Sequence, residues 1–470
     1  MDVKSKIDRR IVGGFGVLFF FMLCVASWAL EWRGLSATIN SETRYQVQWS
    51  DDPHRPYTSD ENSDQDFYEL LGVEADLPWQ KLHFSFYGRY AKDLDGTLKG
   101  SIYQDILETS PERQRLDVYY AYLERQNLWR GLDVRLGRMY IYGADIVHMD
   151  GLSLSWDRLF KSRLDVQLFG GLIVQMYCNL SQDLVGGFNV NVHPLSDLDL
   201  SVKTVFYRET SYRFDLSWRP FEGVKLVGYW ELINNHSRDF NVDLLVRLPK
   251  VGTYVGVNVY RRFWIARDTE DDFLYDYTFS IGDGLKTDIR RFYLSKEAAY
   301  WEITLSVTQP VPKVAGLVVY GKLNWRWLAH DKYEDFFNTD FAKYSVGFSW
   351  EEPIGLKGFY IDSGFSHWRE NRDWSPIYES ESHSYYLDLR QDLFNRLQLR
   401  AGFYYKDEDI NSMIEREGSK VLYGAVKYFF DREAHHKWVE VRYEYNEADY
   451  FEQYGFSSLN LLMVNLGIKL

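Results

Sequence analysis

From about residue 35 to residue 470, apolar and polar residues alternate in a long series of short segments. In the segment 198–206, the apolar side chains fall mainly on even positions and the charged ones on odd positions. A period of two places successive side chains on opposite faces of a β-strand. The pattern therefore predicts many strands, each with one apolar and one polar face.

The same alternation recurs along the whole chain, for example in segments 212–219, 240–247, 397–406 and 439–445. Each face is roughly 9 to 11 residues long, which is enough for a tilted strand to cross a bilayer. In hydrocarbon every backbone N–H and C=O needs an internal partner, so strands can cross only as a closed sheet. We predict an all-β fold, a transmembrane antiparallel up-and-down β-barrel.

The connections between these strands are alternately short and long. Proline and glycine mark most of the short ones, as is typical of tight turns. The predicted turns are 78–81, 127–131, 194–197, 220–223, 249–252, 310–314, 352–357 and 393–396. The longer polar connections are 51–65, 91–114, 266–296, 369–382 and 406–419.

Outer-membrane barrels have short periplasmic turns and long extracellular loops, and an even strand number puts both chain ends in the periplasm. Following this alternation gives about 22 strands, within a range of roughly 20 to 24. The uncertain region is 273–293, where Asp283-Gly284 is a favoured hairpin turn pair. This region is either an extra hairpin or a loop folded inward.

The first thirty residues have the features of an export signal. Four basic residues precede a charge-free stretch at 11–30, and Ser27-Trp28-Ala29 is a small-x-small cleavage site. We expect cleavage after Ala29, so that 1–29 is the signal peptide and 30–470 a single barrel domain. An uncleaved inner-membrane anchor is the alternative, because about twenty uncharged residues could span a bilayer.

The net charge of -14 argues against nucleic acid and polyanionic partners, because like charges repel. Many acidic residues lie in the predicted loops, which fits a solvated rim or, alternatively, divalent ions that bridge to lipopolysaccharide. Outer-membrane lipid and lipopolysaccharide are the expected partners. The 16 Trp, 36 Tyr and 30 Phe suit the aromatic girdles of a barrel at the two membrane interfaces.

The sequence contains no CxxCH haem site, CxxC pair, phosphate loop or GxSxG motif. The adjacent pair His435 and His436 is predicted to lie in a solvated turn, and only Cys178 remains after signal removal. We therefore predict that the protein is not an enzyme, and that it has no cofactor, metal site or intramolecular disulfide.

The polar faces carry opposite charges two residues apart along a strand, which indicates a wet interior. These charges could set ion selectivity, with carboxylates favouring cations, or could only keep the interior solvated and in register. The candidate lumen-lining residues are Asp133, Arg135, Arg163, Asp165, Arg213, Asp215, Asp243, Arg247, Asp388, Arg390, Glu440, Arg442 and Glu444.

Gly137-Arg138 ends one predicted strand, Tyr142-Gly143 lies in the following connection, and Asp150-Gly151 opens the next strand. This stretch of about 20 residues resembles a pattern of porin-like outer-membrane barrels, including alginate-export-type proteins. The resemblance implies an outer-membrane pore. Alginate exporters line their pore with excess positive charge, whereas this chain is acidic, so we do not expect polyanion export.

Barrel diameter grows with strand number, and barrels of about 22 strands usually hold a plug. TonB-dependent receptors resemble this chain in strand number, but they begin with a plug domain, which the early strand pattern here argues against. Our first hypothesis is a porin-like channel for passive passage of small solutes or ions. Its lumen would be of mixed charge with an acidic bias, and loop 91–114 or 266–296 would constrict it.

The alternative hypothesis is a barrel that serves as a scaffold. It would enclose a periplasmic or lumen-filling partner, such as the multihaem cytochrome of an outer-membrane electron conduit. A wide, polar lumen in a chain without a cofactor motif of its own suits this role as well.

Overall fold

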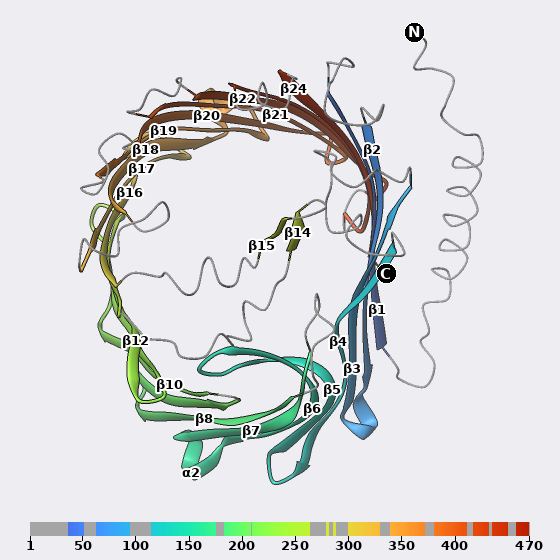
Figure 1. Cartoon of the computed structure of the whole chain (residues 1–470), viewed down its shortest axis with the longest axis vertical. Coiled ribbons are helices and arrows are strands. Elements are labelled where there is room, and N and C mark those ends of the chain that lie inside the picture. The colour runs from blue at the N-terminus through green and yellow to red at the C-terminus, as the bar shows by residue number, and fades with distance from the viewer. Residues whose placement is uncertain are drawn as a thin grey trace.

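The computed structural model describes residues 36–50, 63–94, 114–174, 183–207, 209–263, 279–281, 285–287, 299–329, 339–371, 380–410, 417–431, 435–449 and 457–469. Twenty-two strands form a single sheet in which each strand pairs antiparallel with the next along the chain. The first strand also pairs with the last, so the sheet closes into a ring (Figure 1). The prediction of an antiparallel up-and-down barrel is confirmed.

The strands of the wall are β1 (Ser36–Ser50), β2 (Ser63–Leu77), β3 (Leu82–Asp93), β4 (Gln114–Trp129), β5 (Leu132–Tyr142), β6 (Ile146–Arg158), β7 (Leu164–Ile173), β8 (Leu184–Leu195), β9 (Leu198–Phe206), β10 (Thr210–Phe221), β11 (Val224–Ile233), β12 (His236–Leu248), β13 (Thr253–Arg262), β16 (Tyr300–Pro310), β17 (Leu317–Leu328), β18 (Asp340–Glu351), β19 (Phe359–Asn371), β20 (Ser380–Leu393), β21 (Leu397–Ile410), β22 (Glu417–Phe429), β23 (Lys437–Ala448) and β24 (Ser458–Lys469).

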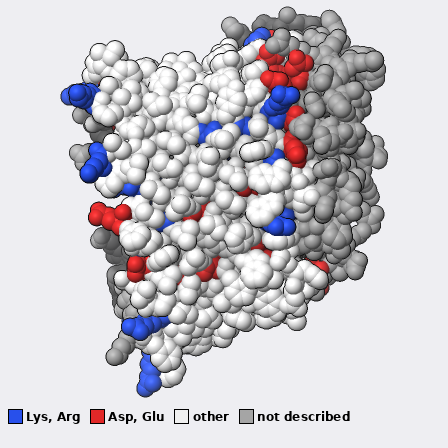
Figure 2. Space-filling model, turned by 90° about the vertical axis from the view of Figure 1, so that its left-hand side faces the viewer, with Lys and Arg blue, Asp and Glu red and all other residues white. Residues whose placement is uncertain are grey.

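The alternation in the sequence becomes two distinct faces of the wall. In β9, the side chains of Leu200 and Val202 are exposed on the outer face of the wall. Lys203, the next residue along the strand, lies on the inner face. Val202 lies opposite Phe214 of β10, so the apolar rows continue from strand to strand. Figure 2 shows the side of the ring around β16–β18, where most charged side chains lie towards two edges of a largely uncharged surface.

Most of the short connections lie on one rim of the barrel, which we call the short-turn rim, and all eight predicted tight turns lie there. The opposite rim also has short connections, at 143–145 and 234–235. Gly223 shows why glycine is needed in the tight turns: its φ is +83°, and a Cβ would lie 2.8 Å from the carbonyl oxygen of Arg247. One turn was not predicted. A short helix, α2 (Leu159–Ser162), joins β6 to β7 without proline or glycine.

The opposite rim, which we call the long-loop rim, carries the longer connections, and most of their residues lie outside the described part of the chain. Some strands run further towards this rim than predicted. β19 extends to Asn371, β20 begins at Ser380 and β21 extends to Ile410. Backbone pairing does not require apolar side chains, so polar residues can continue the ladder beyond the apolar band.

The region 273–293 contains a hairpin that is not part of the wall. β14 (Phe279–Ile281) and β15 (Leu285–Thr287) pair only with each other. In Figure 1 this hairpin projects inside the ring. The strand number of the wall is therefore 22, as predicted.

Among the described residues, no helix combines the length and apolar character needed to cross a bilayer. The predicted signal segment 1–29 and Cys178 lie outside the described residues.

Candidate functional site

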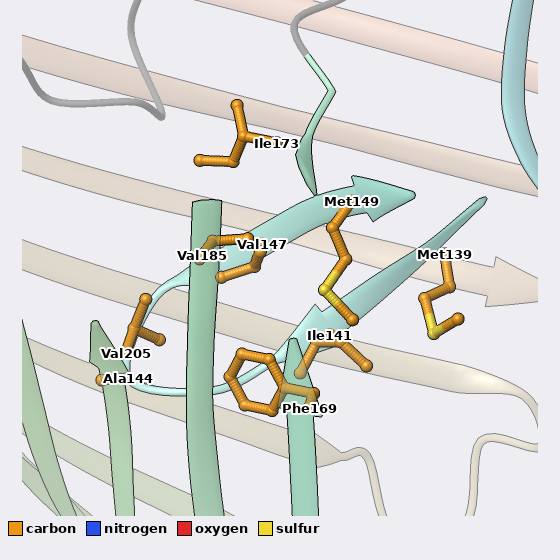
Figure 3. Packing of buried hydrophobic residues seen from close by; sticks show 9 residues of the cluster. All are labelled: Met139, Ile141, Ala144, Val147, Met149, Phe169, Ile173, Val185 and Val205. Carbon is orange, nitrogen blue, oxygen red and sulfur yellow. The ribbon is translucent and has the colours of Figure 1, made fainter. Parts of the chain in front are cut away.

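The β5–β6 hairpin separates from the wall and lies over the inner face of neighbouring strands. β4 pairs with β5 only as far as Ala121, opposite Arg138, although β4 itself continues along β3 to Gln114. β5 and β6 remain paired with each other up to Tyr142 and Ile146. Figure 1 shows the end of this hairpin inside the ring, and Figure 3 shows it crossing over β7, β8 and β9.

A row of glycines lies where the hairpin bends. Gly137 lies opposite Gly151 and Gly151 opposite Gly171, so three neighbouring strands have glycine at this level. A Cβ on Gly151 would lie 2.3 Å from the carbonyl oxygen of Gly170 and 2.7 Å from the Cα of Gly171. Gly137 also has φ +130°, a conformation that other residues rarely adopt. The backbones approach each other too closely here for any side chain, and this permits the bend.

An apolar cluster fixes the hairpin to the wall beneath it. Met139, Val147 and Met149 of the hairpin are fully buried, and they pack with Phe169 of β7 and Val205 of β9. Figure 3 shows these side chains between the two layers. Burying each such side chain is worth roughly 1.5–3 kcal/mol relative to leaving it exposed. The inward-facing residues of β5 are charged near the short-turn rim. They are apolar further along the strand, where the hairpin packs on β7–β9.

The other face of the hairpin carries polar side chains. Arg138 donates to Asp150 through two hydrogen bonds of 2.8 Å, from Nε to Oδ1 and from Nη2 to Oδ2. The rings of Tyr140 and His148 are stacked with centroids 4.2 Å apart. His148 Nε2 donates to the carbonyl oxygen of Tyr119 at 2.8 Å, so this side chain supplies a partner to β4 where β5 has left it. The motif that suggested a porin-like barrel therefore forms this bend.

The tip of the hairpin is anchored by a buried ion pair. The Asp145 carboxylate lies 3.1 Å from Nη1 of Arg238 in β12, and the two side chains are 4% and 8% exposed. Arg238 also lies 3.3 Å from the carboxylate of Glu231 in β11. Asp239 next to it pairs with Arg262 of β13 at 3.1 Å. The tip is thus fixed to β12, and the ion pairs of Arg238 and Asp239 continue from there to β11 and β13.

With the exception of Arg163, the predicted lumen residues lie in wall strands, on the phase opposite the apolar outer face. Arg163 lies in the turn after α2, where its N–H donates to the carbonyl oxygen of Leu159. The prediction placed it in a strand because α2 lacks the usual turn residues. The others are Asp133 and Arg135 in β5, Asp165 in β7, Arg213 and Asp215 in β10, Asp243 and Arg247 in β12, Asp388 and Arg390 in β20, and Glu440, Arg442 and Glu444 in β23.

Several of these charges pair across strands instead of along one. Arg135 lies 2.7 Å from Glu124 of β4. Glu440 lies 3.6 Å from Lys427 of β22. Neighbouring strands are about 4.8 Å apart, whereas residues two apart along one strand are separated by about 6.6 Å. A charged side chain therefore pairs readily with an opposite charge on the neighbouring strand. Arg213 and Asp215 do pair along β10, at 2.8 Å.

A hollow of about 560 Å³ lies on the inward phase of β17–β21, across the ring from the hairpin in Figure 1. Its basic side chains are Lys322, Lys343 and Lys406. Serine hydroxyls line it as well, at Ser345, Ser366, Ser382 and Ser384. The sequence alone gave no indication of this site, because its residues come from five strands.

No family model matches the sequence, and no curated protein is similar to it. Three solved structures with similar folds are each 10% identical in sequence to this chain. The P pilus usher PapC translocation pore matches with a TM-score of 0.48 over 92% of this chain and 99% of its own. A BenF-like porin from Pseudomonas fluorescens Pf-5 has a TM-score of 0.45 (93% of this chain, 99% of its own), and OccAB3 of Acinetobacter baumannii has a TM-score of 0.44 (93% of this chain, 100% of its own).

Proposed function

We propose that this protein is a porin-like channel of the outer membrane, for passive passage of small solutes or ions, narrowed by its own β5–β6 hairpin. A closed sheet with an apolar outer face and a polar inner face satisfies the requirements of a bilayer. The observation that carries the proposal is the hairpin itself, which lies inside the ring and is fixed there by the Asp145–Arg238 ion pair.

The width of the barrel gives the hairpin its role. Barrels of 16 to 18 strands already leave an aqueous channel, so the lumen of a 22-stranded wall is too wide for wall side chains to fill. An unobstructed ring of this size would leak many metabolites. A hairpin held against the wall by apolar packing and by a buried ion pair would narrow the passage permanently, without a separate plug domain.

For selectivity we propose a mixed-charge lumen with a modest preference for cations. The whole chain carries a net charge of -14, and carboxylates at a constriction favour cations. Asp150 on the exposed face of the hairpin is one such carboxylate, although Arg138 balances it. The basic, serine-rich hollow across the lumen would moderate the preference.

The scaffold hypothesis is less well supported. A partner such as a multihaem cytochrome would need the space that the hairpin occupies. A barrel that stays silent in a bilayer, or that co-purifies with a haem protein, would favour the scaffold over the channel.

Single-channel recording in planar bilayers tests the proposal. The wild-type protein should conduct in discrete steps, and its reversal potential in a salt gradient should indicate a cation preference. Asp145→Asn and Arg238→Ala should release the hairpin and increase the conductance. Glu444→Gln is the matched control, because it removes a charge from the 2.8 Å Arg442–Glu444 pair of β23 without touching the hairpin. Equal conductance in all four proteins would contradict the proposal.

A further inference from the structure

Two histidines and a glutamate meet on the outer face of the wall, near the long-loop rim. His367 of β19 lies directly opposite His383 of β20 in the strand register, and Glu381 is two residues from His383 on the same phase. Phe365 and Tyr385 share this phase, and Tyr385 is 48% exposed on the apolar outer surface. The three polar side chains therefore face away from the lumen.

The distances between their nitrogen and oxygen atoms suit a metal ion. Nδ1 of His367 and Nδ1 of His383 are 3.1 Å apart. Nε2 of each histidine lies close to Oε1 of Glu381, at 3.6 Å for His367 and 3.7 Å for His383. Tetrahedral Zn²⁺ with bonds of about 2.0–2.1 Å separates its ligand atoms by roughly 3.3 Å. Small rotations of the side chains would bring one atom of each residue to this spacing.

The ligand atoms of His367, Glu381 and His383 all lie within 4.8 Å of one another. No other His, Cys, Asp or Glu residues in the described part of the chain form such a group of three. Aromatic rings hold both imidazoles in place. His367 contacts the Tyr344 ring with centroids 4.8 Å apart, and His383 stacks on Phe365 at 6.1 Å with an interplanar angle of 17°. Ligands fixed in this way on two rigid strands lose little conformational entropy when they bind an ion.

The group lies at a height where an ion in water can reach it. A strand of 14 residues such as β20, tilted by about 40°, rises roughly 35 Å, whereas the apolar band is about 25 Å tall. Glu381 and His383 are the second and fourth residues from the long-loop end of β20. The side chains of Glu381, His383 and His367 are 48%, 42% and 13% exposed. Glu381, one residue from the end of β20, lies beyond an apolar band of this height centred on the strand.

We propose that His367, His383 and Glu381 bind one divalent cation of the Zn²⁺ class on the outer surface of the barrel. Two imidazoles and one carboxylate select Zn²⁺ and similar transition metals over Mg²⁺ and Ca²⁺, which prefer sites made entirely of oxygen ligands. The protein supplies three ligands, and the fourth position is open to an oxygen from outside the chain. The ion would link β19 to β20 at the rim and stabilise the folded barrel, because it binds the folded state.

Zinc binding by the full-length, tag-free protein in detergent micelles tests the site, with Zn²⁺ alone as the probe. We expect about one zinc per chain by elemental analysis and titration calorimetry. His367→Gln and His383→Gln should each weaken binding about tenfold or more, and Glu381→Gln should weaken it less. Excess Mg²⁺ should not compete.

The matched control is the double substitution His435→Gln with His436→Gln, which removes two exposed histidines from the short-turn rim. This control should bind zinc like the wild type. The X-ray absorption spectrum of the bound zinc should show two imidazole nitrogens at about 2.0–2.1 Å. Equal zinc binding by the wild type and by a folded His367→Gln, His383→Gln double variant would overturn the proposal, as would a spectrum with oxygen ligands only. If the double variant fails to fold, zinc binding by the single variant His383→Gln is compared with that of the wild type, and equal binding would overturn the proposal.

Discussion

Single residue positions decide where the wall of this barrel can bend. Gly170 and Gly171 are adjacent in β7, yet their surroundings differ. A Cβ on Gly171 would lie 2.4 Å from the carbonyl oxygen of Asp150, whereas a Cβ on Gly170 meets nothing closer than 3.6 Å. Gly171 is therefore required by its neighbour strand, and Gly170 is not.

We predict that Gly171→Ala destabilises the folded barrel and that Gly170→Ala does not. The extra methyl at position 171 must push β6 away from β7, and overpacking of this kind costs about 1–3 kcal/mol. Urea unfolding of the two variants in lipid vesicles, followed by tryptophan fluorescence, measures the difference. Equal unfolding midpoints for both variants would show that the two strands do not approach this closely.

A second residue-scale prediction concerns the buried charge at the hairpin tip. Arg238→Ala leaves the carboxylates of Asp145 and Glu231 without this buried cation, and the loss of one partner from a buried pair costs about 3–5 kcal/mol. Glu444→Gln breaks a more exposed pair, for which a loss of about 0–1 kcal/mol is typical. Denaturant titrations should separate the two variants, and a smaller loss for Arg238→Ala than for Glu444→Gln would refute the assignment.

At the scale of the element, the β5–β6 hairpin combines a wall segment with a separate internal layer. Below the bend, Asp133 and Arg135 have the inward phase of β5. Above it, Met139 and Ile141 continue that phase, but they are buried against β7–β9 instead of facing water. The period of two is unbroken, so the alternation alone does not reveal the bend.

Val147→Asp should detach this hairpin. Val147 is fully buried in the cluster, and an unpaired carboxylate there costs on the order of 3 kcal/mol or more. We expect a larger single-channel conductance and faster proteolysis of the hairpin, while the wall remains closed. Ile146→Asp is the control, because this neighbouring side chain is 49% exposed on the other face. The same conductance in both variants would argue against the hairpin as the constriction.

At the scale of the whole molecule, the ring has an outer face for lipid and an inner face for water. β18 shows both faces at adjacent residues. Val346 is 54% exposed among apolar neighbours, whereas Ser345 lines the basic hollow of the lumen. The two residues lie at nearly the same depth in the bilayer, so they differ mainly in that Val346 faces lipid and Ser345 faces the water of the lumen.

We predict that Val346→Arg destabilises the barrel in a bilayer by about 2–4 kcal/mol, and that Ser345→Arg has an effect close to zero. The guanidinium must leave water in the first variant only. Unfolding in phospholipid vesicles measures both values, and the difference should shrink in a detergent solution without a continuous apolar band. The reverse order of the two values would mean that the assignment of the faces is wrong.

The sequence by itself determined the architecture of the wall. Alternation in segments such as 198–206 and the short turns marked by proline and glycine are local features, and the bilayer allows them only one closed arrangement. The strand number, the direction of pairing and most turns followed from these features. The turn at α2 did not, because its residues carry no turn signature, and Arg163 was misplaced for the same reason.

Only the tertiary structure decided what lies against what. Asp145 and Arg238 are 93 residues apart, and no local pattern connects them. His367 and His383 became a pair of neighbours through the register of β19 and β20. The physical reason is that a period of two fixes the face on which a side chain lies. Its partners depend on how the strands align and bend, and that depends on contacts formed across the closed ring.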